Sequence, residues 1–209
     1  MSDSKVNIVG IGCDFQSETD ENSRKLAIEN LSGSEQDRIN WFVKNMHKNK
    51  AFRYYATNKN KEEKKILLDQ LSKDYITYRK NWKSQPTNSF EKKIYGQKFE
   101  NNNLNPLCFD IEVASICDLA CSFCYRQYVS TPDKIMKKEL AFKLIDQASR
   151  LKVPSIKFNW RGEPLLNSKL PEIIDYAKQK GILETMINTN ATKLNKEMSE
   201  KIIKSGLDI

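Results

Sequence analysis

Short apolar segments alternate with amphipathic segments in the second half of the chain. Residues 107–113 (LCFDIEV) and 155–160 (SIKFNW) place apolar side chains at alternate positions and are rich in strand-forming residues. This period of two is typical of β-strands. We assign a third strand to residues 184–190 (ETMINTN), and residues 207–209 resemble the start of a fourth.

The segments between these strands follow helical periodicity. Residues 137–150 carry apolar side chains three and four positions apart, which predicts a helix with one buried face. A second helix is predicted over residues 169–180, and Gly181 suits its C-terminal end. A third runs from Asn195, a residue suited to an N-cap, to Ser205.

The order of these elements, β-loop-α, β-α, β-α, β, predicts parallel strands joined by right-handed crossovers. The repeat length fits a TIM-like barrel or an open doubly wound sheet. We predict an α/β fold, a partial TIM-like (βα) barrel over residues 105–209. Three units and the start of a fourth strand cannot close a barrel. We therefore expect an N-terminal fragment, incomplete at the C-terminus and poorly active alone.

Residues 1–104 predict a separate, partly helical N-terminal region with a linker. Residues 1–33 are polar and show poor periodicity, which favours partial flexibility. Residues 35–48 predict a helix with Ser34 as its N-cap.

A longer helix is predicted over residues 62–83, with Pro86 ending it. Residues 84–106 have turn-forming ends and are interpreted as a linker. The apolar stripe of the helix predicts packing against a neighbouring domain. It consists of Leu67, Leu71, Tyr75, Tyr78 and Trp82.

Composition narrows the possible classes of protein. The formal net charge is +8, but the basic excess is spread along the chain, which disfavours a nucleic-acid-binding surface. The sequence has neither a stretch of about 20 apolar residues, as a membrane span needs, nor a secretory signal, so we predict a cytoplasmic protein without a membrane partner.

Three of the five cysteines, Cys117, Cys121 and Cys124, fall within eight residues in the spacing C-x3-C-x2-C. An odd count with this crowding favours a metal site in a reducing compartment over disulfides. Thiolates are the usual ligands of iron–sulfur clusters, and three of them leave one iron of a four-iron cluster open. The loop follows the first strand, at the end where parallel sheets place their chemistry.

Two other kinds of metal site stay open. Zinc prefers four nitrogen or sulfur ligands, and an electron-transfer cluster also needs a fourth cysteine. The single histidine, His47, lies far upstream in sequence, and Cys13 and Cys108 are the remaining thiols. The alternative function is therefore a non-catalytic zinc or iron–sulfur structural module, with or without nucleic acid.

The segment CDLACSFCYR resembles the radical S-adenosylmethionine superfamily, whose signature has an aromatic residue where Phe123 stands. The resemblance covers residues 105–209. It implies that Cys117, Cys121 and Cys124 bind a 4Fe-4S cluster and that its open iron chelates the amino and carboxylate groups of S-adenosylmethionine. It also implies that Phe123 lies near the adenine.

Two further segments carry the resemblance. Gly162, Glu163 and Pro164 follow the second strand, where many members have Gly-Gly-Glu-Pro, and Arg161 replaces the first glycine. The resemblance implies that the backbone of this segment receives the methionyl amine. The third strand ends in Asn190, a possible cofactor contact, where relatives often show Thr-Asn-Gly.

The resemblance also implies the chemistry and the partners. An external one-electron donor, flavodoxin- or ferredoxin-like, reduces the cluster, and S-adenosylmethionine is cleaved to a 5′-deoxyadenosyl radical that takes hydrogen from an unknown substrate. Similarity to the branch with a C-terminal SPASM domain favours peptide or protein modification, followed by a sugar or other small molecule. RNA is disfavoured because the charge is diffuse. No catalytic side chain is assigned. Asp110 and Glu112 alternate with apolar residues on the first strand, and we favour a carboxylate there that pairs with Lys or Arg.

Overall fold

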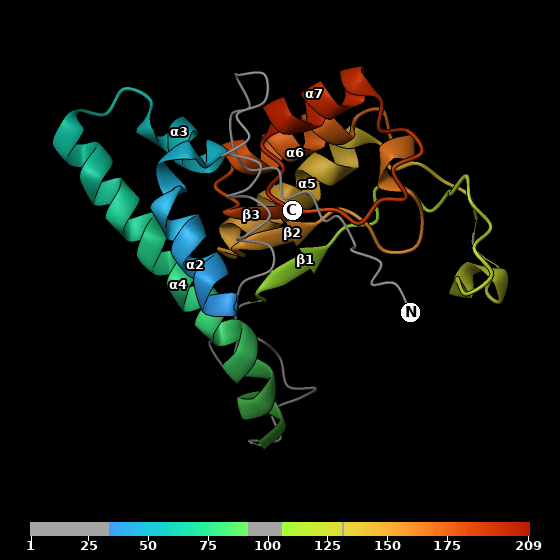
Figure 1. Cartoon of the computed structure of the whole chain (residues 1–209), viewed down its shortest axis with the longest axis horizontal. Helices are drawn as coiled ribbons and strands as arrows, with labels where there is room; N and C mark the ends of the chain where they lie inside the picture. The colour runs from blue at the N-terminus through green and yellow to red at the C-terminus, as the bar shows by residue number, and fades with distance from the viewer. Residues whose placement is uncertain (1–33, 92–105, 131) are drawn as a thin grey trace, which may run out of the picture.

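A computed structural model describes residues 34–91, 106–130 and 132–209 of the 209-residue chain, without the side chains of residues 89–91 (Figure 1). The expectations for residues 1–33, including Cys13, and for residues 92–105 lie outside the described residues.

A parallel sheet forms the centre of the second half. Its strands are β1 (Cys108–Asp110), β2 (Ser155–Lys157) and β3 (Glu184–Met186), in the order β1-β2-β3. Both pairs of neighbouring strands are parallel. The predicted α/β fold and parallel order are confirmed, and the three-stranded sheet is not closed. It accounts for three adjacent units of a partial TIM-like barrel.

The helices that connect the strands lie together on one side of the sheet (Figure 1). They are α5 (Lys138–Arg150), α6 (Leu170–Gln179) and α7 (Lys196–Ser205), and α6 packs between the other two. All three were predicted to within one residue at each end. Asn195 caps α7 by accepting a hydrogen bond from the backbone N–H of Met198.

The core lies between the sheet and these helices. Ile156 and Phe158 of the second strand segment are fully buried there. Helix α5 contributes Ala141, Ile145 and Ala148, whereas Leu140 is 50% exposed. The buried face of α5 is therefore formed by Ala141, Ile145 and Ala148, and Leu140 lies outside it.

The chain after α7 turns back along β3. The backbone N–H groups of Asp208 and Ile209 donate to the carbonyl of Thr185, and the N–H of Ile187 donates to the carbonyl of Ile209. Gly206, with φ of +88°, makes the turn in the left-handed conformation that glycine tolerates best. The predicted start of a fourth strand therefore lies beside β3.

Among the described residues, three α-helices precede the sheet. They are α2 (Glu35–Lys44), α3 (Lys50–Ala56) and α4 (Lys61–Glu91), with a short 3₁₀ turn at Met46–Lys48. Ser34 forms a complete capping box with Asp37, so the predicted N-cap is confirmed. Helix α3 was not predicted, because seven residues show too little periodicity to identify.

Helix α4 runs through Pro86, so the prediction that Pro86 ends it is wrong, and residues 84–91 are helix rather than linker. A proline inside a helix removes one backbone hydrogen bond and costs about 3 kcal/mol. Residues 86–88 are exposed and Trp82, whose carbonyl loses its donor, is 42% exposed. Water can therefore hydrogen-bond to that carbonyl, which reduces the penalty.

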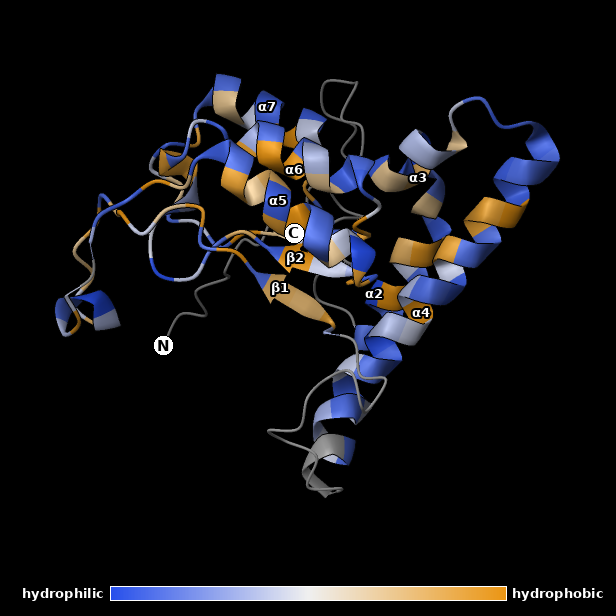
Figure 2. Cartoon of the chain, turned by 180° about the vertical axis from the view of Figure 1, so that it is seen from behind, coloured by the Kyte–Doolittle hydropathy of each residue, from blue (hydrophilic) through white to orange (hydrophobic). Residues whose placement is uncertain are grey.

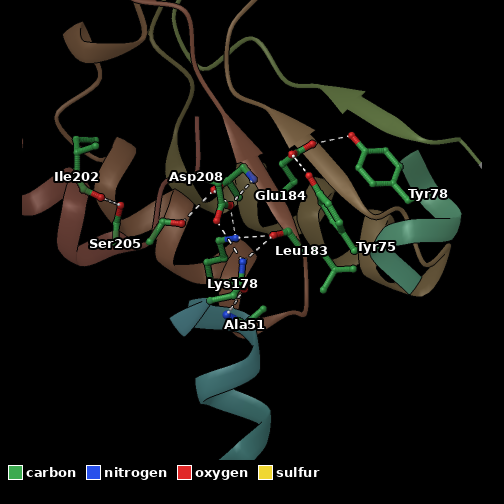
Figure 3. A network of polar contacts seen from close by, with 12 residues as sticks. Ala51, Tyr75, Tyr78, Lys178, Leu183, Glu184, Ile202, Ser205 and Asp208 are labelled. Carbon is green, nitrogen blue, oxygen red and sulfur yellow. Dashed lines mark hydrogen bonds and ion pairs between the residues drawn. The ribbon is translucent and has the colours of Figure 1, made fainter. Parts of the chain in front are cut away.

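Helix α4 is attached to the start of β3 through a buried carboxylate (Figure 3). Glu184 is 1% exposed and accepts hydrogen bonds from the hydroxyls of Tyr75 (3.0 Å) and Tyr78 (2.7 Å). Arg79 lies 3.6 Å from the same carboxylate, and Phe42 of α2 stacks on Tyr75 with ring centroids 3.8 Å apart. The predicted packing of this helix against the α/β part of the chain is thus observed.

A second buried polar group joins the two parts of the chain. Lys178 of α6 is fully buried and donates to Asp208 and to the carbonyl of Leu183 (Figure 3). Asn49, the N-cap of α3, donates to the same two acceptors. The start of α3 and the middle of α4 are therefore both held against the segments around β3.

Replacing Tyr78 by phenylalanine is expected to lower the free energy of unfolding by about 2 kcal/mol, because a hydrogen bond to a buried carboxylate is lost. Urea denaturation of the chain measures this change. Tyr128→Phe is the control, since Tyr128 is 80% exposed. Equal stability of both variants would show that the Tyr78 hydroxyl does not stabilise the interface.

Candidate functional site

The three segments singled out in the sequence follow the three strands and meet at one edge of the sheet. The cysteine loop follows β1, Gly162 and its neighbours follow β2, and Asn190 follows β3. Parallel α/β folds place ligand sites at this carboxyl edge.

Gly162 allows the loop after β2 to touch the segment that leads into the cysteine loop. A Cβ atom at this position would lie 2.3 Å from the carbonyl oxygen of Ala114 and 2.5 Å from that of Ile116. The backbone N–H of the next residue, Glu163, donates to the same Ile116 carbonyl at 2.9 Å. A side chain at position 162 would prevent this contact, which holds the residue immediately before Cys117.

The carboxylate of Glu163 is buried and used within the protein. It accepts hydrogen bonds from the backbone N–H of Leu165 (2.9 Å), the hydroxyl of Thr189 (2.7 Å) and the backbone N–H of Asn190 (2.7 Å). The residue is 2% exposed. Pro164 follows as the first residue of a 3₁₀ turn, Pro164–Leu166. Glu163 therefore fixes the loop after β3, and its side chain does not face a ligand.

Asn190 contacts the cysteine motif itself. Its side-chain amide donates to Asp118 at 2.9 Å and lies 3.8 Å from the sulfur of Cys117. The hydroxyl of Thr192 donates to the other oxygen of Asp118 at 2.6 Å. The hydrogen bonds from Thr192 and Asn190 lower the pKa of Asp118 to about 2. Sequence reasoning named Asn190 but missed Asp118 and Thr192.

The three motif cysteines are free and partly exposed, and their side chains do not converge. Within the described residues no group of three or more His, Cys, Asp or Glu side chains could hold a metal ion. The loop that carries Cys121 and Cys124 extends away from the sheet, with the turn Tyr125–Gln127 near its tip (Figures 1 and 2). Phe123, in the same loop, is 89% exposed.

The donor set nevertheless fits a cluster with three protein ligands. Cys108 is half-buried in β1, and burial raises the pKa of its thiol, so it is a poor fourth ligand. His47 lies in the 3₁₀ turn Met46–Lys48 of the helical region, away from the carboxyl edge. Among the described residues, three thiols without a further cysteine or histidine at this edge match a four-iron cluster with one open iron better than a zinc site with four nitrogen or sulfur ligands.

Arg161 is paired within the protein. Its guanidinium donates to both carboxylate oxygens of Glu112, with one bond of 2.7 Å, and its backbone N–H donates to Glu112 at 3.1 Å. These hydrogen bonds lower the pKa of Glu112. The favoured pairing of a strand-one carboxylate is observed, and Arg161 ties the loop after β2 to the segment after β1.

Ala191 adopts the left-handed conformation, with φ of 62°. A residue with a Cβ pays roughly 1–2 kcal/mol there, whereas glycine does not. We expect Ala191→Gly to raise the free energy of unfolding by about 1 kcal/mol, because the relieved strain exceeds the added flexibility of the unfolded chain. Urea denaturation measures the change, and a fall in stability would contradict this assignment.

Comparison with known proteins shows similarity over the part of the chain that contains these residues. Residues 111–209 match the profile of the Radical SAM superfamily. This part of the chain is similar to that superfamily. Members of the superfamily use a 4Fe-4S cluster and S-adenosylmethionine, so the predicted resemblance to the superfamily and its cofactors is confirmed.

Curated relatives match about half of the chain. A tungsten-containing aldehyde ferredoxin oxidoreductase cofactor-modifying protein of Pyrococcus furiosus is 28% identical over 100 residues, 47% of this chain and 28% of the relative. The Fe-coproporphyrin III synthase of Methanosarcina barkeri is 36% identical over 95 residues, 44% of this chain and 23% of the relative. A probable GTP 3′,8-cyclase of Methanococcus maripaludis is 32% identical over 101 residues, 48% of this chain and 33% of the relative. The chain thus spans about a quarter to a third of these relatives.

A solved structure of BtrN in complex with AdoMet and 2-DOIA matches 49% of this chain and 43% of that chain, with a TM-score of 0.46 and 24% identity. Among the described residues, no helix is long and apolar enough to cross a membrane.

Proposed function

We propose that this chain is part of a radical SAM enzyme in which Cys117, Cys121 and Cys124 bind a 4Fe-4S cluster that cleaves S-adenosylmethionine. The observation that carries the proposal is the convergence of the three motif segments at the carboxyl edge of the sheet. Cys117 lies next to Ile116, which Gly162 and Glu163 contact, and beside Asn190. Together the two cofactors supply one-electron cleavage of the sulfonium and a radical that abstracts hydrogen.

The residues of the chain divide into ligands and supports. The three thiolates bind iron, and the loop that carries Cys121 and Cys124 closes toward Cys117 when they do so. Gly162 and Pro164 shape the backbone that faces the methionyl group. Glu163 acts by holding the backbone of Asn190, since its own oxygens already accept three hydrogen bonds. Phe123 supplies an exposed ring for the adenine.

The substrate and the electron donor are also proposals. The names of the relatives refer to GTP, a coproporphyrin and an enzyme cofactor, which favours a small organic molecule over the peptide that the sequence suggested. GTP is the first probe to test, with a peptide library as the comparison. The external one-electron donor and the cytoplasmic location stay predictions.

The test is anaerobic reconstitution of the 209-residue chain, followed by iron and sulfide analysis and EPR of the reduced cluster with and without S-adenosylmethionine. About four irons per chain are expected, as in a 4Fe-4S cluster, with a signal that shifts when S-adenosylmethionine binds. Zinc in place of iron, or a signal that ignores S-adenosylmethionine, would favour the structural-module alternative.

A further inference from the structure

Asp118 lies inside the cysteine motif, yet the proposed function gives it no role. Its carboxylate accepts hydrogen bonds from Asn190 on one oxygen and from Thr192 on the other, at 2.9 and 2.6 Å. Lys193 lies 3.5 Å from the same carboxylate. All three partners belong to the loop after β3, more than 70 residues away in sequence. The residue next to the first motif cysteine is thus tied to another strand.

The partners of Asp118 are themselves held in place. The backbone of Asn190 and the hydroxyl of Thr189 donate to the buried carboxylate of Glu163. The hydroxyl of Thr192 also lies 3.0 Å from the side-chain oxygen of Asn190, so the two donors support each other. Asp118 therefore binds a preformed pair of donors.

The rest of the cysteine loop lacks such support. Among the described residues, the hydrogen bonds of residues 119–130 stay within the loop and its base, for example Cys124 N–H to the Cys121 carbonyl and Arg126 to Asp133. The attachment to the neighbouring strands consequently ends at Asp118. Cys117 is on the attached side, whereas Cys121 and Cys124 are on the unattached side.

We propose that Asp118 is a positioning residue that latches Cys117 to the loop after β3, so that the first ligand is in place before Cys121 and Cys124 close on the cluster. The role of Cys117 as a ligand rests on the proposed function, whereas the hydrogen bonds of Asp118 that form the latch exist in the chain without iron. The latch acts through hydrogen bonds, so it does not need the charge of Asp118. An asparagine can accept from Asn190 with its oxygen and donate to the Thr192 hydroxyl, which then donates to the oxygen of Asn190.

The test measures the alkylation rate of each cysteine in the metal-free, reduced chain, using iodoacetamide and peptide mass spectrometry. Losing these hydrogen bonds to a charged acceptor is expected to raise the rate at Cys117 about tenfold in Asp118→Ala. Cys124 should keep its rate. Asp118→Asn should stay near the wild-type rate at both cysteines.

The charge of Asp118 could also slow the alkylation of Cys117, because a nearby carboxylate disfavours the reactive thiolate. Asp118→Asn removes this charge and keeps the hydrogen bonds, so it distinguishes the two effects. If Asp118→Asn accelerates Cys117 as much as Asp118→Ala does, charge explains the effect and the latch is overturned. Asp133→Ala is the matched control in the same loop, since its partner Arg126 lies on the unattached side. It should leave Cys117 unchanged.

A second readout separates the latch from the proposed function. Under limiting iron, Asp118→Ala should incorporate less cluster than the wild type, and Asp118→Asn should restore it. If the wild-type chain takes up no iron, the proposed function fails, while the alkylation result still decides on the latch. If Asp118→Ala leaves the alkylation of Cys117 unchanged, the latch fails, even when the wild-type cluster forms normally.

Discussion

Replacing Cys124 by alanine is expected to abolish the cluster and the formation of 5′-deoxyadenosine. The motif supplies three thiolates, and in the described part of the chain no other cysteine or histidine lies at the carboxyl edge, so two thiolates would have to hold four irons. Loss of even an outer partner of a metal ligand typically costs 10–100-fold, so loss of a ligand should cost more than about 100-fold. Iron content and 5′-deoxyadenosine, measured after anaerobic reconstitution, test this expectation.

Cys108→Ala provides the matched control. Cys108 is also a free cysteine, but it lies in β1, and burial raises the pKa of its thiol. Its replacement should leave iron, sulfide and the EPR signal unchanged. If Cys108→Ala removes the cluster and Cys124→Ala does not, the ligand set is wrong and a site that includes β1 must be considered.

The order and type of the elements could be predicted because each carries a local signal. Ser34 at the N-cap, the strand pattern before and after α5, and Asn195 before α7 all identify their elements without tertiary information. Pro86 was misinterpreted because the cost of a proline depends on whether water reaches the carbonyl that loses its donor. Solvent exposure of that kind is not visible in the sequence.

The sequence also did not show which side chains of α5 are buried. Leucine is more hydrophobic than alanine, but Leu140 is half exposed while Ala141 is fully buried. The small side chain lets the helix approach the sheet closely, and that requirement comes from the partner surface rather than from the helix.

Part of the candidate site could be predicted from the sequence, and part could not. The cysteine spacing and the segment Gly162–Pro164 are short motifs, and the sequence alone identified them. The contacts of Asp118 with Asn190 and Thr192 join residues 72 and 74 positions apart, and no local sequence pattern predicts them. A carboxylate within a thiolate motif was the one available signal. Its partners became visible only when the strands brought the loops to one edge.

The role of Glu163 also needed the structure. Its place in the segment indicated a cofactor contact through the backbone, and the structure shows that its buried carboxylate already accepts three hydrogen bonds from protein donors. The backbone around Gly162 is therefore the part of this segment that is left to approach a cofactor, and its shape depends on the absence of a side chain.

Replacing Gly162 by alanine is expected to lower the free energy of unfolding by about 3 kcal/mol, because the added methyl group overpacks a contact that cannot yield easily. It would lie 2.3 Å from the Ala114 carbonyl oxygen and 2.5 Å from that of Ile116, and both are backbone atoms. Relief requires the segment before Cys117 to move, which breaks the hydrogen bond from Glu163. Urea denaturation of the iron-free chain measures the stability, and reconstitution measures the cluster.

Gly206→Ala is the control that distinguishes a local effect of Gly162→Ala on the cysteine loop from a general loss of stability. Gly206 ends α7 with φ of +88°, so alanine there is strained by roughly 1–2 kcal/mol. Both variants should unfold at lower urea, but only Gly162→Ala should also lose iron and the EPR shift with S-adenosylmethionine under conditions where both chains are folded. If Gly206→Ala lost as much cluster, stability alone would control assembly. The close approach of Gly162 to the cysteine loop would then have no specific role, and the support of Cys117 would rest on the loop after β3.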